Sequence, residues 1–176
     1  MKIAYTMAQG KGDTDLMLFR LAEKLATEGY HTSGTVQINT EREGCACDMD
    51  VMVLPKGPSL RISQDLGKAS KGCRLDPAAL EAAVGMVASC IGPQLDILII
   101  NKFGKHEAEG RGFRSVIADA IACDVPVLVG VNSINLEAFH RFAGVEVTML
   151  EPSEGSLLAW VRKASGRCEK EPDCTF

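Results

Sequence analysis

Apolar segments of strand length alternate along the chain with segments whose apolar residues recur at helical spacing. Residues 2–7, 96–101 and 126–131 are short runs dominated by apolar residues, which is typical of parallel strands covered on both faces. Between residues 16 and 25, apolar side chains instead return every three or four positions, and Gly29 follows as a helix stop. This alternation predicts a three-layer α/β fold with a mainly parallel sheet.

The remaining elements are predicted from local signals. Asp76 followed by Pro77 is typical of a helix start, with the aspartate as N-cap and the proline in the first turn. Ser153 is expected to cap the last helix in the same way. Helices are therefore expected over residues 76–90, 113–123, 135–142 and 153–164, and one more strand over 145–150.

Residues 31–64 differ in character from the segments on either side. Prolines and glycines separate the last two of three short strand-like segments there, which are 35–39, 49–54 and 60–63. We expect a β-rich insertion after the first helix. It belongs to a single domain over residues 1–165, and a polar, flexible tail follows at 166–176.

The composition is that of one globular domain. The 176 residues are 46% hydrophobic and 24% charged, which suffices for one core of ordinary size. The formal net charge is −4 and only 5% of the residues are aromatic, which argues against nucleic acid as a partner. No apolar run approaches the ~20 residues of a membrane span, and no signal-peptide pattern opens the chain. We therefore expect a cytoplasmic protein without membrane insertion.

A glycine-containing loop lies between the first predicted strand and the first predicted helix. Glycines allow backbone N–H groups to turn toward an anion, the following helix directs its positive dipole end to the same place, and Lys11 adds a charge. The alternative is a plain strand–helix turn that uses glycine for its geometry. The candidate residues for binding a small anionic ligand are Gln9, Gly10, Lys11, Gly12, Asp13, Thr14 and Asp15.

This loop departs from the Walker A pattern G-x-x-x-x-G-K-[ST]. If Gly12 is the last glycine of the motif, Met7 stands in place of the first. Asp13 then stands where the phosphate-binding lysine belongs, and Lys11 lies two positions upstream of that place. Thr14 matches the hydroxyl residue that holds Mg²⁺, which makes it a candidate magnesium ligand.

A second, densely charged segment covers residues 102–111, directly after a predicted buried strand. Ligands of open α/β sheets bind at the carboxyl ends of the strands, so this segment is expected to face the glycine loop. Lys102, Lys105 and Arg111 are then an anion clamp, with Glu107 as a base or metal ligand. The alternative is a solvated loop with surface salt bridges.

Residues 56–74 interleave hydroxyl and basic side chains with glycines. The segment suits either a lid over the anion site or an exposed loop, and the exposed loop is the stronger interpretation.

The seven cysteines are an odd number, which favours reduced thiols in a cytoplasmic chain. Cys45, Cys47 and Cys73 are a weak candidate for a thiolate metal site, because the spacing C-x-C is not that of structural zinc. Cys90 and Cys123 fall on helical apolar patterns and are predicted to lie in the core.

The stretch 101–107, Asn-Lys-Phe-Gly-Lys-His-Glu, resembles the Asp-Glu-Ile-Gly-Lys-Met-Glu type motif of the thermophile-type nucleoside triphosphatases. The resemblance covers roughly residues 1–145. It implies a P-loop NTPase-like fold with the β-rich insertion after the first helix, and an acidic pair that organises magnesium and water. Asn101 and Lys102 stand at those two acidic positions here, so charge is exchanged across the site. Lys102 either pairs with Asp13 or supplies the cation that Asp13 cannot.

Three stretches, 4–16, 47–76 and 101–113, are similar to a bacterial family whose genes are recorded beside molybdate transport genes. This second resemblance covers nearly the whole chain. It implies a context in molybdenum handling and does not imply an activity.

Three functional hypotheses remain open at this point. The first is a binding protein for an oxyanion such as molybdate, or for a nucleotide phosphate, that uses Asn101, Lys102 and the loop without efficient hydrolysis. The second is a divergent Mg²⁺-dependent nucleoside triphosphatase with Thr14 and either Glu107 or Glu109 in catalysis. The third is a regulatory partner of a molybdenum-handling protein. A homo-oligomer is compatible with all three.

Overall fold

The computed structural model describes residues 2–42, 45–64, 74–144 and 146–167, with the side chains of 41–42 and 45–47 left aside. Several predictions fall wholly or partly outside this range, among them the Cys45, Cys47 and Cys73 group, the lid over residues 56–74, the tail over 166–176 and the first residue of the strand predicted at 145–150. Within it, no helix has both the length and the apolar character needed to cross a membrane.

The described chain alternates strands and helices in the order β1 (Ile3–Thr6), α1 (Asp13–Thr27), β2 (Thr32–Arg42), β3 (Cys45–Val53), β4 (Ser59–Arg61), α2 (Pro77–Ala88), β5 (Ile97–Phe103), α3 (Lys105–Ala108), α4 (Arg114–Ala122), β6 (Val127–Val131), α5 (Leu136–Ala143), β7 (Thr148–Leu150) and α6 (Glu154–Ser165). The predicted N-caps are confirmed. Asp76 accepts hydrogen bonds from two backbone N–H groups of the first turn of α2, and Ser153 accepts one from α6.

The strands form one sheet in the order β4-β3-β2-β5-β6-β1-β7. The five strands from β2 to β7 in this order run parallel to one another. β3 and β4 are antiparallel additions at the edge beside β2. The α/β fold with a mainly parallel sheet and a β-rich insertion after the first helix is confirmed.

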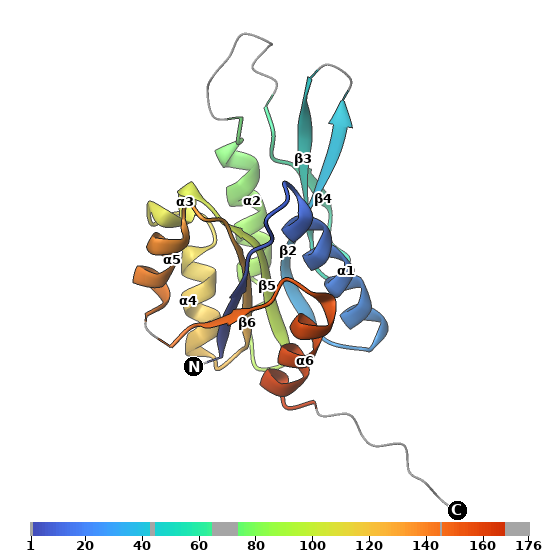
Figure 1. Ribbon diagram of the computed structural model, residues 1–176, viewed down its shortest axis with the longest axis vertical. Helices are drawn as coiled ribbons and strands as arrows, with labels where there is room; N and C mark the ends of the chain where they lie inside the picture. The colour runs from blue at the N-terminus through green and yellow to red at the C-terminus, as the bar shows by residue number, and fades with distance from the viewer. Residues whose placement is uncertain (1, 43–44, 65–73, 145, 168–176) are drawn as a thin grey trace, which may run out of the picture.

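Two apolar clusters separate the sheet from its helices. α1 and α6 cover one face, where Leu18, Leu21 and Leu157 pack against alternate strand residues. α2, α4 and α5 cover the other face around Phe103, Ile117 and Phe139. These three layers are visible in Figure 1, with the ribbon of β2 and β3 projecting beyond the helices.

The predicted strand at 35–39 is part of a longer strand. The first residues of β2 pair with β5 in the core sheet, and the rest pairs with β3. Thr32 and Ser33 are buried within it. Gly34 permits the close pairing, because a Cβ there would lie 1.9 Å from the carbonyl oxygen of Ile99.

Two further expectations are wrong in detail. The charged segment after residue 101 is not a continuous loop, since β5 extends to the buried Phe103 and α3 follows at once. Cys90 and Cys123 are exposed rather than in the core. Helices α2 and α4 end just before them, so the apolar periodicity that suggested burial no longer applies at these two positions.

Candidate functional site

The glycine loop lies at a point where the direction of the sheet's connections changes. β1 lies between β6 and β7. The chain leaves β1 for α1 on one face of the sheet and leaves β6 for α5 on the other. In open α/β sheets such a switch point opens a crevice outside the carboxyl ends of the strands.

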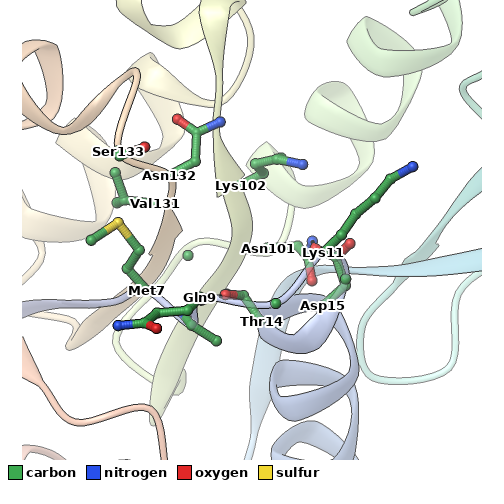
Figure 2. Close-up of a pocket in the computed structure, with 14 residues that line it drawn as sticks. Met7, Gln9, Lys11, Thr14, Asp15, Asn101, Lys102, Val131, Asn132 and Ser133 are labelled. Carbon is green, nitrogen blue, oxygen red and sulfur yellow. Dashed lines mark hydrogen bonds between the residues drawn. The ribbon is translucent and has the colours of Figure 1, made fainter.

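A cavity of about 420 Å³ occupies this crevice (Figure 2). Met7 and Val131 lie on one side of it, and Asn101 and Asp15 lie on the other. Its walls come from the β1–α1 loop, the end of β5 and the β6–α5 connection, and they comprise Met7, Ala8, Gln9, Gly10, Lys11, Gly12, Thr14, Asp15, Asn101, Lys102, Gly130, Val131, Asn132 and Ser133.

The β1–α1 loop forms few hydrogen bonds within itself. Gly12 is the N-cap residue of α1 and has a φ of 85°, a conformation that favours glycine. The hydroxyl oxygen of Thr14 accepts a 2.9 Å hydrogen bond from the N–H of Ala8, which closes the loop at its base. In the part of the chain that the structure describes, the N–H groups of residues 9–12 donate to no protein acceptor. Such a row of unpaired donors before a helix N-terminus suits an anion.

The two lysines of the cavity carry its positive charge. Lys11 and Lys102 are both exposed, and neither forms an ion pair within residues 2–42, 45–64, 74–144 and 146–167. The suggested pairing of Lys102 with Asp13 is therefore wrong. The Asp13 carboxylate instead lies over Gly10, where a Cβ would come within 1.9 Å of Oδ2. Lys102 remains free to contact an anion.

Asp15 is a buried carboxylate held by amides rather than by a cation. Its side chain lies at the start of α1, and only 6% of the residue is exposed. Asn101 Nδ2 donates to Oδ1 at 2.7 Å, and Asn39 Nδ2 donates to Oδ2 at 2.7 Å. Gln37 Nε2 donates to Asn39 Oδ1 at 2.7 Å and lies 3.5 Å from Asp15 Oδ2. This amide network connects the helix after the loop to β5 and to the β2 ribbon.

The hydrogen bonds of Asp15 also bear on whether the site can hold a magnesium ion. Mg²⁺ is usually bound through one or two carboxylates, but both oxygens of Asp15 are engaged by amides, and Asn101 is neutral. No group of three or more His, Cys, Asp or Glu side chains in the described chain is placed to hold a metal. These residues do not fit a resident Mg²⁺. Thr14 as its ligand stays a prediction that this geometry does not favour.

The acidic residues of the second segment lie elsewhere. Glu107 is buried at 3% exposure, and its two carboxylate oxygens accept hydrogen bonds from the N–H groups of Gly104 and Phe113, at 2.9 and 3.1 Å. This carboxylate joins α3 to the start of α4. Glu107 does not line the loop cavity, so its role as a base stays a prediction with no support from its contacts.

Glu109 neutralises the cations proposed as a clamp. It pairs with Arg111 and lies 3.7 Å from Lys105 Nζ. The hydrogen bond from Arg111 holds the pKa of Glu109 below its ordinary value, and the Lys105 ammonium acts in the same direction. Of the predicted clamp, the structure brings only Lys102 to the loop cavity. Lys105, Arg111 and Glu109 instead line a second, more apolar hollow of about 520 Å³, which shares Asn101, Lys102 and Asn132 with the loop cavity.

Some residues of the site were missed by sequence reasoning. Asn132 and Ser133 line the cavity. Both follow directly after a buried strand, and this position could have identified them as candidate site residues. Gln37 and Asn39 lie in the insertion and carried no such signal.

Residues 3–160 match the family model described as "Protein of unknown function (DUF2478)", and the chain belongs to this family. "Molybdenum import ATP-binding protein ModC 2" of Bradyrhizobium diazoefficiens is 36% identical over 170 residues. The match covers 96% of this chain but only 19% of that protein, so the chain spans about a fifth of its relative's length.

Two solved structures resemble the fold. The solution structure of a human cancer-related nucleoside triphosphatase has a TM-score of 0.64 at 16% identity and covers 96% of this chain and 100% of its own. The crystal structure of THEP1 from Aquifex aeolicus has a TM-score of 0.61 at 17% identity and covers 93% and 96%. The predicted P-loop NTPase-like fold is confirmed, and at these identities the likeness concerns the fold alone.

Proposed function

We propose that this member of the DUF2478 family binds a tetrahedral oxyanion on the β1–α1 loop, either a nucleotide phosphate or a free oxyanion, without efficient hydrolysis. The observation that carries the proposal is a row of N–H groups at residues 9–12 that have no acceptor among the described residues, in a loop that lines a cavity at the switch point of the sheet. Unpaired donors at this place suit an anion.

The nearby positive charges support the same ligand, although the Asp13 carboxylate lies over Gly10. α1 directs its positive dipole end at the loop, and Lys11 and Lys102 flank the cavity without ion-pair partners among the described side chains. The carboxylate of Asp15 is already satisfied by amides. A hydrogen bond to a charged group contributes about 1.5–3 kcal/mol, so several such contacts, from the loop and both lysines together, are needed to offset the cost of association.

Hydrolysis is not part of the proposal because the contacts of the acidic residues do not support it. Activation of a water needs a free base within hydrogen-bond reach of it. Asn101 stands at the position where the resembling enzymes carry an acid, and Glu107 is engaged by two backbone N–H groups. Glu109 is paired on the surface.

The name of one relative suggests the biological context. That protein is a molybdenum import ATP-binding protein, so we propose a role for this chain in molybdenum handling, with molybdate as one candidate anion. A regulatory role beside an importer is the alternative within that context. It predicts no binding of small anions and co-purification with a protein partner.

The experiment is isothermal titration calorimetry of the purified protein. Phosphate, sulfate, molybdate, tungstate, ADP and ATP are titrated with and without Mg²⁺. We expect at least one anion to bind, and a Lys11→Ala/Lys102→Ala double variant to weaken its binding at least tenfold, because two charge-assisted contacts are lost. The same ligand at ~100-fold over its Kd stabilises the fold by about 2.7 kcal/mol, which a thermal-shift scan detects.

The matched control is Lys163→Ala, which removes an exposed lysine from the last turn of α6. It is expected to leave binding unchanged. An anion affinity that the double variant does not alter contradicts the proposal. Release of phosphate from a nucleotide in the presence of Mg²⁺ or Mn²⁺ assigns the protein to the divergent triphosphatases instead.

A further inference from the structure

The apolar cluster on the α2, α4 and α5 face of the sheet borders the second hollow, the one of about 520 Å³. Four buried side chains belong to this cluster and also line the hollow, which are Val51, Ile62, Leu80 and Phe113. They come from β3, from the residue after β4, from α2 and from the start of α4. Sites for small molecules are mainly apolar and measure about 300–1,000 Å³, so the hollow has the size and the walls of such a site.

An exposed isoleucine lies at the same hollow. Ile134, in the connection from β6 to α5, lines it and is 86% exposed. Contact of an apolar side chain with water is unfavourable. A ligand with an apolar body that covers Ile134 therefore gains burial that the described part of the chain does not provide.

The charges around the hollow favour a negatively charged group. Its lining includes two carboxylates and three cations, which are Glu107, Glu109, Lys102, Lys105 and Arg111. Both carboxylates are engaged, Glu107 by two backbone N–H groups and Glu109 by Arg111 and Lys105. Lys102 is exposed and forms no ion pair among the described side chains. It is therefore the cation that a ligand in the hollow can contact.

We propose that the second hollow binds an organic anion. Its apolar body packs against Val51, Leu80 and Ile134, and its anionic group contacts Lys102. A carboxylate, a phosphate or a sulfonate supplies the same charge, so the ligand class is defined by a body of ring size and one anionic group. The inference goes beyond the proposed function, because a free oxyanion on the loop has no apolar body and no residue of the loop lines this hollow.

The first test uses the probe 8-anilino-1-naphthalenesulfonate, which joins apolar rings to one sulfonate and fluoresces more strongly in apolar surroundings. A fluorescence titration of the full chain is expected to show saturable binding. Methyl NMR of the same complex is expected to show shifts at Val51, Leu80 and Ile134 but not at Leu157, which lies on the opposite face of the sheet. Absence of binding, or shifts confined to other methyl groups, overturns the proposal.

The second test uses two exposed positions, where substitution does not endanger folding. Ile134→Ala and Lys102→Ala are each expected to weaken the probe roughly fivefold or more, which corresponds to about 1 kcal/mol. N-phenyl-1-naphthylamine has the same rings without the sulfonate, and Lys102→Ala is expected to bind it as the unaltered protein does. Met149→Ala, which removes another exposed apolar side chain from β7, is the matched control for Ile134→Ala. Probe affinity that neither Ile134→Ala nor Lys102→Ala changes contradicts the proposal.

A variant of Lys11 separates this site from the loop. Lys11 lines the loop cavity but not the second hollow, so Lys11→Ala is expected to weaken inorganic phosphate and to leave the probe affinity unchanged. If Lys11→Ala weakens the probe as much as Lys102→Ala does, the sulfonate lies on the loop and the second site is wrong. A dimer in sedimentation velocity that Ile134→Ala dissociates assigns the hollow to a second copy of this chain, and that result also overturns the proposal.

Discussion

Replacement of Glu107 by Gln distinguishes a structural carboxylate from a catalytic one. The two carboxylate oxygens of Glu107 accept the N–H groups of Gly104 and Phe113 at 2.9 and 3.1 Å, and the side chain is 3% exposed. Gly112 allows the chain to fold closely over this carboxylate, because a Cβ there would lie 2.2 Å from Oε1. In Glu107→Gln one oxygen becomes an NH₂ group that faces a backbone donor.

The expected loss follows from these contacts. One hydrogen bond to a charged group is removed, which costs about 1.5–3 kcal/mol, and the opposed donors have little room to separate. We expect the free energy of unfolding to fall by about 2–3 kcal/mol, and therefore Tm by roughly 4–12 °C for a chain of this size. Anion affinity should be unchanged.

Urea denaturation, followed by circular dichroism and by the fluorescence of the single Trp160, measures the stability, and calorimetry measures the binding. Glu109→Gln is the control, because Glu109 lies in an exposed ion pair and such pairs contribute little. The reasoning is refuted if Glu107→Gln unfolds at the same urea concentration as the unaltered protein but no longer binds the anion. Glu107 would then act in the site rather than in the scaffold.

Three further predictions concern other positions. A Gly130→Ala variant should lose roughly 1–3 kcal/mol in urea denaturation, because the new Cβ would lie 2.1 Å from the backbone oxygen of Asn101; unchanged stability would mean that β5 and β6 separate easily. The pKa of Glu109, lowered in the folded state mainly by Arg111, should return toward its ordinary value in Arg111→Ala when followed by NMR titration. Since the pKa of Glu109 is depressed in the folded state, the small stabilisation from this pair is complete above the unfolded pKa and is lost as pH falls through the folded pKa. If the pKa of Glu109 is the same in Arg111→Ala as in the unaltered protein, Arg111 is not its cause. Asp76→Ala should cost about 1 kcal/mol and 2–4 °C in Tm through loss of the N-cap of α2, and an unaltered melting curve would show that the cap is dispensable.

The parts of the fold that sequence reasoning predicted correctly depend on neighbours along the chain. Buried parallel strands such as 126–131 are recognisable because both of their faces must be apolar. Helix starts such as Asp76 are recognisable because one side chain satisfies the N–H groups two or three residues later. The loop after the first strand was found for the same reason, since its glycines and the following helix are contiguous.

The errors have one physical origin. Cys90 and Cys123 continue an apolar periodicity, but the helices end just before them. The charged segment after residue 101 does not remain a loop, because β5 continues through the buried Phe103. In each case the end of a helix or strand lies at another residue than the local pattern predicted.

The sequence by itself determined the layers, the place of the loop at the end of the first strand, and the exchange of charge between Asp13 and Lys102. Only the tertiary structure decided what those charges meet. It joined Asp15 to Asn101, 86 residues away, separated Lys102 from Asp13, and engaged Glu107 with the backbone. The reason is that a hydrogen bond needs two groups within about 3 Å and in the correct orientation. Residue types and spacing specify neither for groups that the fold brings together from different strands and helices.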